Sequence, residues 1–166
     1  MAHHNLLDES RVYEEDCTIE HNEELGRLLD DWEVDLFLSG HLHVQHHKTS
    51  KEYEIDEIVT SALSISPCQY GILQYFGPDH YFYSTEKTDV SGWAELRNNP
   101  DRNLQDFQWY ADEFLQESFY KEAVNELQGK GLSQEDIQGM AELYAMVNVQ
   151  AVAGKLYEIR DEIQSD

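Results

Sequence analysis

Two histidine clusters contain the residues best suited to chemistry. His41 and His43 lie in the tetrapeptide 40–43, Gly-His-Leu-His, which follows the apolar run 34–39. A second cluster, His3 and His4, lies in the tetrapeptide 2–5. Imidazole is a common ligand of zinc, manganese and iron, and two histidines one residue apart after a strand can face one pocket. The clusters therefore indicate a site for divalent metal ions.

An α/β arrangement of the first part of the chain would bring the clusters together. Residues 1–6 and 34–38 are predicted strands. A predicted helix between them begins at Asn22 or Glu23 and ends at Trp32, with apolar residues at helical spacing. Such a sheet presents ligands at the carboxyl ends of its strands. We therefore expect both clusters to contribute to one site.

The segment after His43 reads as antiparallel sheet. Strands rich in Tyr, Phe, Ile and Val are predicted at 44–48, 55–63, 70–76 and 81–85. A turn signal at 77–80 makes the last two a hairpin that closes a sheet. His46 and His47 would lie on opposite faces of an exposed strand, which argues against a joint metal role.

The last part of the chain reads as helical. A linker at 91–103 precedes a helix at 104–128, which ends at Gly129. Ser133 begins the next helix, with Asp136 in a near capping box, and a break at 153–154 precedes a final helix at 155–163. The aromatic stripe of the first long helix reads as core, with a partner-binding groove as the alternative. We therefore predict an α+β chain with domains at 1–90 and 104–166.

Composition limits the possible partners. The chain of 166 residues is 40% hydrophobic and carries a net charge of −23, which repels nucleic acids and anionic membranes. No run approaches the roughly 18 apolar residues of a membrane span, and the start lacks the pattern of a signal peptide. As it stands the chain is expected to be cytoplasmic. Cys17 and Cys68 can form a disulfide or stay as two thiols.

Residues 1–85 resemble the calcineurin-like metallophosphoesterases. That family ends its metal site with a histidine after a strand and then a Gly-His-x-His motif, which tetrapeptides 2–5 and 40–43 match. The resemblance implies that His3 and His41 bind one metal ion and His43 binds its neighbour. It leaves His4 either near the substrate or at the surface, and assigns no catalytic residue.

The resemblance also implies a fold and an activity. Residues 58–63 and 67–71 are similar to the segment after this motif in bacterial exported or cytoplasmic phosphodiesterase-like members, and the helical end is similar to their helical domain. The implied fold is the C-terminal half of an α/β/β/α sandwich, followed by a small helical domain. The implied activity is hydrolysis of a phosphoester, in particular a phosphodiester, with manganese, iron or zinc.

The chain departs from the family by lacking the Asp-x-His, Gly-Asp and Gly-Asn-His motifs. Two metal ions about 3.5–4 Å apart need a bridging carboxylate, which those motifs supply. We therefore expect the C-terminal portion of a longer enzyme, which can be an exported one, with little activity of its own. Exposed sheet edges would favour a homo-oligomer. The alternative is a non-catalytic interaction module that uses the helical region.

Overall fold

The computed structural model of the chain describes residues 1–8, 17–77 and 80–155. They divide into two compact units, one containing residues 1–62 and 69–86 and the other containing 63–68 and the chain from 87 onward. The first unit holds the β-sheets and one helix, and the second is helical. This composition confirms the α+β class.

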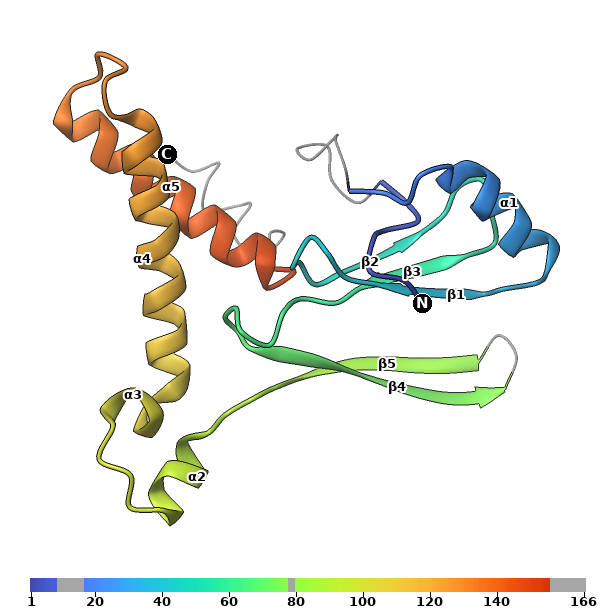
Figure 1. Cartoon of the computed structure of the whole chain (residues 1–166), viewed down its shortest axis with the longest axis horizontal. Helices are drawn as coiled ribbons and strands as arrows, with labels where there is room; N and C mark the ends of the chain where they lie inside the picture. The colour runs from blue at the N-terminus through green and yellow to red at the C-terminus, as the bar shows by residue number, and fades with distance from the viewer. Residues whose placement is uncertain (9–16, 78–79, 156–166) are drawn as a thin grey trace. The chain divides into compact units, whose positions relative to one another are not determined.

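A three-stranded sheet forms the centre of the first unit (Figure 1). Its strands are β1 (Leu36–Ser39), β2 (His46–Thr49) and β3 (Asp56–Val59), in the order β1-β3-β2. The middle strand, β3, runs parallel to β1 and antiparallel to β2. Ile58 and Val59 of β3 are almost fully buried, as expected for a central strand that is covered on both faces.

The segment 2–5 pairs with β1 without forming the strand predicted over 1–6. The Ala2 amide donates to the Leu38 carbonyl, and the Gly40 amide donates to the His3 carbonyl, both at 3.0 Å. On the other side Asn5 forms a single parallel bridge with Thr18. The hydrogen bonds alternate between two neighbours within four residues, so no ladder extends along either one.

Helix α1 (Asn22–Asp31) covers one face of the sheet, close to its predicted limits. Leu6, Phe37 and Ile55 form the buried core between them, and Leu25 and Leu29 of α1 pack against it. The apolar residues predicted at helical spacing are therefore the ones that attach the helix to the sheet.

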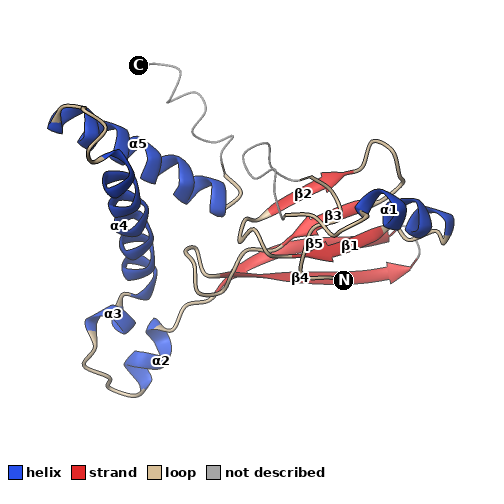
Figure 2. Ribbon diagram, turned by 45° about the horizontal axis from the view of Figure 1, so that its top comes forward, coloured by secondary structure: helices blue, strands red, loops and turns tan. Residues whose placement is uncertain are grey.

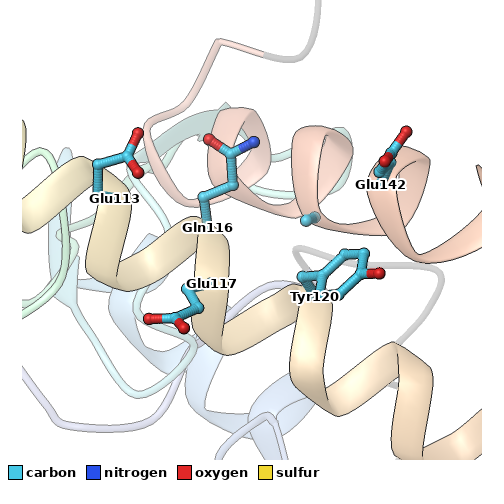
Figure 3. A pocket seen from close by; sticks show the side chains of 6 residues that line it. Glu113, Gln116, Glu117, Tyr120 and Glu142 are labelled. Carbon is cyan, nitrogen blue, oxygen red and sulfur yellow. The ribbon is translucent and has the colours of Figure 1, made fainter. Parts of the chain in front are cut away.

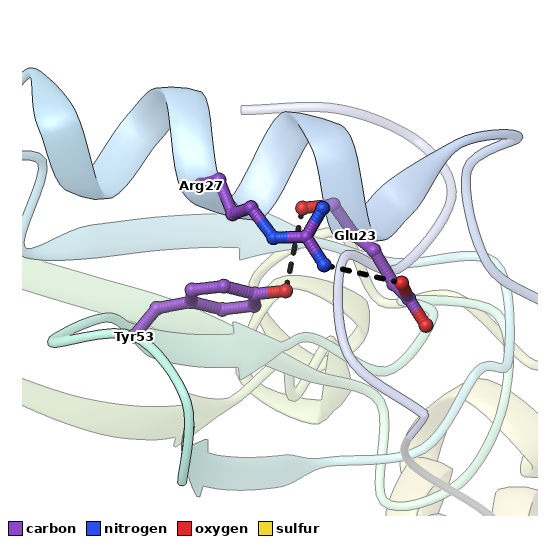
Figure 4. A network of polar contacts seen from close by, with 3 residues as sticks. All are labelled: Glu23, Arg27 and Tyr53. Atoms are coloured by element: carbon purple, nitrogen blue, oxygen red, sulfur yellow. Dashed lines mark hydrogen bonds and ion pairs between the residues drawn. The ribbon is translucent and has the colours of Figure 1, made fainter.

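The ring of Tyr53, in the loop between β2 and β3, packs directly against α1 at Gly26. A Cβ at Gly26 would lie 2.5 Å from Cε2 of Tyr53, so the ring occupies the space that a larger residue would need. The Tyr53 hydroxyl donates to the Glu23 carbonyl at 3.3 Å, beside an exposed pair between Glu23 and Arg27 (Figure 4). A larger residue at this position of the helix would have to displace the Tyr53 ring.

The hairpin of β4 (Gln69–Gly77) and β5 (His80–Lys87) forms a separate two-stranded sheet. We expected it to close the first sheet, but it lies on the face opposite α1 (Figure 1). Its tyrosines reach the first sheet: Tyr81 donates to Asp56 at 2.5 Å, and the Gln45 side chain donates to Tyr83 at 2.9 Å. Side-chain contacts therefore replace the expected ladder.

Two short helices lie where the linker 91–103 was predicted. They are α2 (Ser91–Leu96) and α3 (Arg102–Gln105). Ala94 of α2 is fully buried, and the Asp101 side chain accepts the Asn103 amide at 2.9 Å to begin α3. Burial and capping therefore stabilise short helices that have too few residues to show a periodic pattern.

Helices α4 (Phe107–Leu127) and α5 (Gln134–Val152) form a helical hairpin (Figure 2). Small side chains let them pack closely, with Ala123, Ala141 and Ala145 buried between them. Helix α5 ends at Val152, beside the predicted break, and the helix predicted at 155–163 lies almost wholly outside the described residues. None of the described helices is both long and apolar enough to cross a membrane.

Candidate metal-binding site

Three imidazole rings meet at the end of β1. His3 and His4 come from the segment 2–5, and His41 comes from the loop after β1. The centroid of the His41 ring lies 5.0 Å from the centroid of the His3 ring and 4.2 Å from that of the His4 ring. The structure therefore brings one histidine of the second cluster, His41, against both histidines of the first, as neighbouring segments of one sheet were expected to do.

The separation of two ring nitrogens decides what the cluster can bind. Nδ1 of His41 and Nε2 of His3 are 3.1 Å apart, which suits a hydrogen bond when one of them carries a proton. It also suits two ligands of one ion, because metal–nitrogen bonds of about 2.1 Å place neighbouring nitrogens about 3.0–3.4 Å apart. The distance alone is therefore compatible with either arrangement.

His43 is not part of this ring cluster. Its side chain is exposed, and the ring contacts at the end of β1 join His3, His4 and His41. His4 thus occupies the place beside the pair. Within the described residues, no three His, Cys, Asp or Glu side chains are arranged to hold a metal ion as they stand.

The loop that carries His41 has a strained backbone. His41 has a φ of 65° and His43 a φ of 55°, in the left-handed region that favours glycine. Such conformations cost about 1–3 kcal/mol for other residues and cluster at functional sites. His41 and His43 thus place two such conformations one residue apart in this loop.

A buried carboxylate lies beneath the histidine-bearing segments. Glu57 on β3 is fully buried. It accepts hydrogen bonds from the amides of Leu6 at 2.9 Å and Leu7 at 2.6 Å, and from the Ser39 hydroxyl at 2.5 Å. Sequence reasoning missed this residue. The available signal was an acidic residue inside an apolar strand, where a buried charge needs several partners.

The neighbouring residue, Asp56, faces the hairpin, because successive side chains of a strand alternate. Burial alone would raise the pKa of its carboxyl group, but hydrogen bonds from Thr49 and Tyr81 and the nearby His47 outweigh that effect and lower it. His47 lies 3.3 Å from Asp56 and is exposed, as predicted. Burial and the bond to Asp56 raise the pKa of Tyr81, so its hydroxyl remains a donor.

The second unit contains an acidic hollow between α4 and α5 (Figure 3). Its lining includes the carboxylates Glu113, Glu117 and Glu142, with Tyr120 beside them. Glu117 is engaged by Lys121 at 2.7 Å. The carboxylates do not converge on one point in the close view, so the hollow lacks the arrangement of a cation site.

Cys17 and Cys68 are both buried and form no disulfide with each other, which decides between the two alternatives that the sequence left open. Burial is the main cause that raises the pKa of the Cys68 thiol, and the Asp112 carboxylate raises it further. Lys87 lowers this pKa to a smaller degree. A thiol with a raised pKa is a poor nucleophile and a poor metal ligand.

The helical region matches a known family. Residues 89–166 match the family described as the C-terminal domain of cyclic nucleotide phosphodiesterase. The helical region therefore resembles a domain found in a phosphodiesterase family. The match begins after the histidine cluster, so the resemblance of residues 1–85 to calcineurin-like metallophosphoesterases stays a prediction. No curated protein matches the chain.

Proposed function

We propose that the chain is part of a metal-dependent phosphodiesterase of the calcineurin-like type, with His3 and His41 as ligands of one divalent ion. The observation that carries this proposal is the 3.1 Å separation of their ring nitrogens. The phosphodiesterase-related match of residues 89–166 supports the substrate class. Manganese, iron and zinc are the proposed metals, since imidazole is a ligand for each.

The chemistry assigns different roles to the residues. A divalent ion at this site would lower the pKa of a water molecule and neutralise charge that develops on a phosphoryl group. His3 and His41 would hold the ion. His43 is proposed for a neighbouring ion, which in the parent enzyme also needs a bridging carboxylate. The strained loop 40–43 would set the direction of His41.

Metal binding by the isolated chain tests the ligand assignment. We expect isothermal titration with Zn²⁺ to show one site, weakened by at least about 100-fold in His3→Ala and in His41→Ala, because loss of a ligand exceeds the 10–100-fold effect of losing its support. His80→Ala, which removes an exposed histidine at the start of β5, is the control. Equal binding by His41→Ala and wild type would refute the assignment.

Hydrolysis of a chromogenic phosphodiester with added Mn²⁺ tests the reaction. Turnover that His41→Ala loses and His80→Ala keeps would show that the histidines support catalysis in this chain. Metal binding without turnover is the result expected if the bridging carboxylate belongs to another part of the parent enzyme.

One observation favours the second candidate, an interaction module. Trp109, Phe114 and Met140 of the long helices are each at least half exposed, and Phe114 belongs to the aromatic stripe that was predicted to be core. A second copy of the chain is the proposed partner. Sedimentation should show association that depends on concentration and weakens in Phe114→Ser. A monomer throughout would reject this candidate.

A further inference from the structure

We propose that Glu57 is a positioning residue for the histidine cluster. Its carboxylate joins the two backbone segments that carry the histidines and so sets the separation of His3 from His41. The proposal deepens the proposed function where it concerns metal affinity. Where it concerns the geometry of the metal-free protein, it stands independently.

The hydrogen bonds of Glu57 reach both segments. Leu6 and Leu7 follow the His3–His4 pair, and their amides donate to the two oxygens of the Glu57 carboxylate. Ser39 ends β1, two residues before His41, and its hydroxyl donates to the same carboxylate. One buried side chain therefore fixes the exit of one segment and the entry of the other.

Asn5 adds a direct link between the same segments. It is fully buried, and its side-chain amide donates to the Ser39 hydroxyl at 2.9 Å. Ser39 therefore accepts a hydrogen bond from the histidine segment and passes one to Glu57. Because the chain of bonds runs Asn5, Ser39, Glu57, a change at either end alters the support of both histidine clusters.

Sheet register explains why this position serves the purpose. Glu57 pairs with Phe37 across the parallel β1–β3 ladder, and Ser39 lies two residues beyond Phe37 on β1. Residues two apart share one face of a strand, so Ser39 and Glu57 face the segment 2–7 together. The amides of Leu6 and Leu7 and the Ser39 hydroxyl all donate to Glu57, which suits the acceptor oxygens of a carboxylate.

Glu57→Gln is the first test, because the amide keeps the shape but replaces one acceptor oxygen with a donor. Glu54→Gln is the control, since it makes the same change of charge at an exposed side chain before the same strand. Two readouts apply: nuclear Overhauser contacts between the His41 ring and the rings of His3 and His4 without metal, and Zn²⁺ affinity by titration.

We expect folded Glu57→Gln to lose the ring contacts and to bind Zn²⁺ about 10–100-fold more weakly, the usual effect of removing support behind a ligand. Glu54→Gln should change neither readout. Glu57→Asp, which restores the carboxylate, should recover part of both. If Glu57→Gln lowers only the melting temperature and keeps the ring contacts, Glu57 merely stabilises the fold and the proposal fails.

Ser39→Ala keeps the test decisive if Glu57→Gln does not fold. It removes the hydroxyl link but leaves both amide bonds to Glu57, so we expect weakened ring contacts in a folded protein. Unchanged contacts in Ser39→Ala would overturn the proposal. If wild-type protein binds no Zn²⁺, the proposed function fails, while the ring contacts still decide the role of Glu57.

Discussion

The contacts that stabilise each unit internally differ in how far apart their residues lie in the sequence. In the first unit, Glu57 binds the amide of a residue 51 positions away, and His41 meets His3 across 38 positions. In the helical hairpin of the second unit, the contacts are more local: Ser133 caps α5 through Asp136, and α5 packs against the preceding long helix. The candidate site thus depends on the contacts that sequence patterns reveal least.

The largest expected effect on stability comes from shortening one buried side chain in the core of each unit. Leu6→Ala and Ile137→Ala each remove a buried branched side chain and should each cost about 2–5 kcal/mol of unfolding free energy. Only Leu6 lies in the segment that follows the histidine pair. Zn²⁺ titration should therefore show weaker binding in Leu6→Ala and unchanged binding in Ile137→Ala. Equal Zn²⁺ affinities of Leu6→Ala and Ile137→Ala would show that the core around Leu6 gives the histidines no special support.

The next largest effect concerns a contact of the first unit whose contribution to stability should depend on pH. Tyr81→Phe removes a hydrogen bond to the Asp56 carboxylate and should cost about 1.5–3 kcal/mol near neutral pH. The pKa of Asp56 is lowered in the folded state, so its stabilisation is present above the unfolded value of about 3.9 and is lost as the pH falls through the folded value.

Denaturant unfolding between neutral pH and about pH 3 would measure this contact. The difference between wild type and Tyr81→Phe should shrink below about pH 4, where the carboxyl group becomes protonated. Tyr120→Phe in the second unit is the matched control and should show no such trend. A difference that stays constant down to the lowest pH would contradict the role of Asp56.

Two helical glycines distinguish the units by their surroundings. Gly26→Ala would place a Cβ 2.5 Å from the Tyr53 ring and should destabilise by about 1–3 kcal/mol. Gly139→Ala on α5 meets nothing within 4 Å and should stabilise by nearly 1 kcal/mol through helix propensity. Melting temperatures that shift in the same direction would refute this reading.

The smallest expected effects are at the helix starts. Ser133→Ala removes the side-chain cap of α5 and should cost about 1 kcal/mol. His21 begins α1 with a φ of 60° and no side-chain cap bond, so His21→Gly should stabilise by about 1 kcal/mol. Denaturation midpoints check both, and a destabilised His21→Gly protein would show that this histidine has a further role.

The sequence predicted the elements that have strong local signals. The limits of α1 and α4 lie within about three residues of their predicted positions, because apolar spacing and terminal glycines define them. The Ser133 cap was predicted for the same reason, and the structure confirms it. The meeting of the histidine clusters followed from the rule that neighbouring segments deliver residues to one sheet edge.

What the sequence could not predict depends on long-range contacts. The place of His4 beside His41 follows from the backbone bonds of Ala2 and Gly40, which no spacing reveals. Glu57 stands inside an apolar strand, but the donors that bind it come from segments distant in sequence, which no local pattern reveals. The positive φ of His43, which goes with its exposed side chain, has no sequence signal comparable to a glycine.

The long reach of the Glu57 contacts has a consequence for the order of folding. Contacts between residues far apart in sequence form late, because the intervening chain must first be ordered, whereas a hairpin of adjacent helices forms early. We therefore expect α4 and α5 to assemble before His3 reaches His41. During refolding, metal uptake at the proposed site would report the moment when His3 meets His41 at the end of β1.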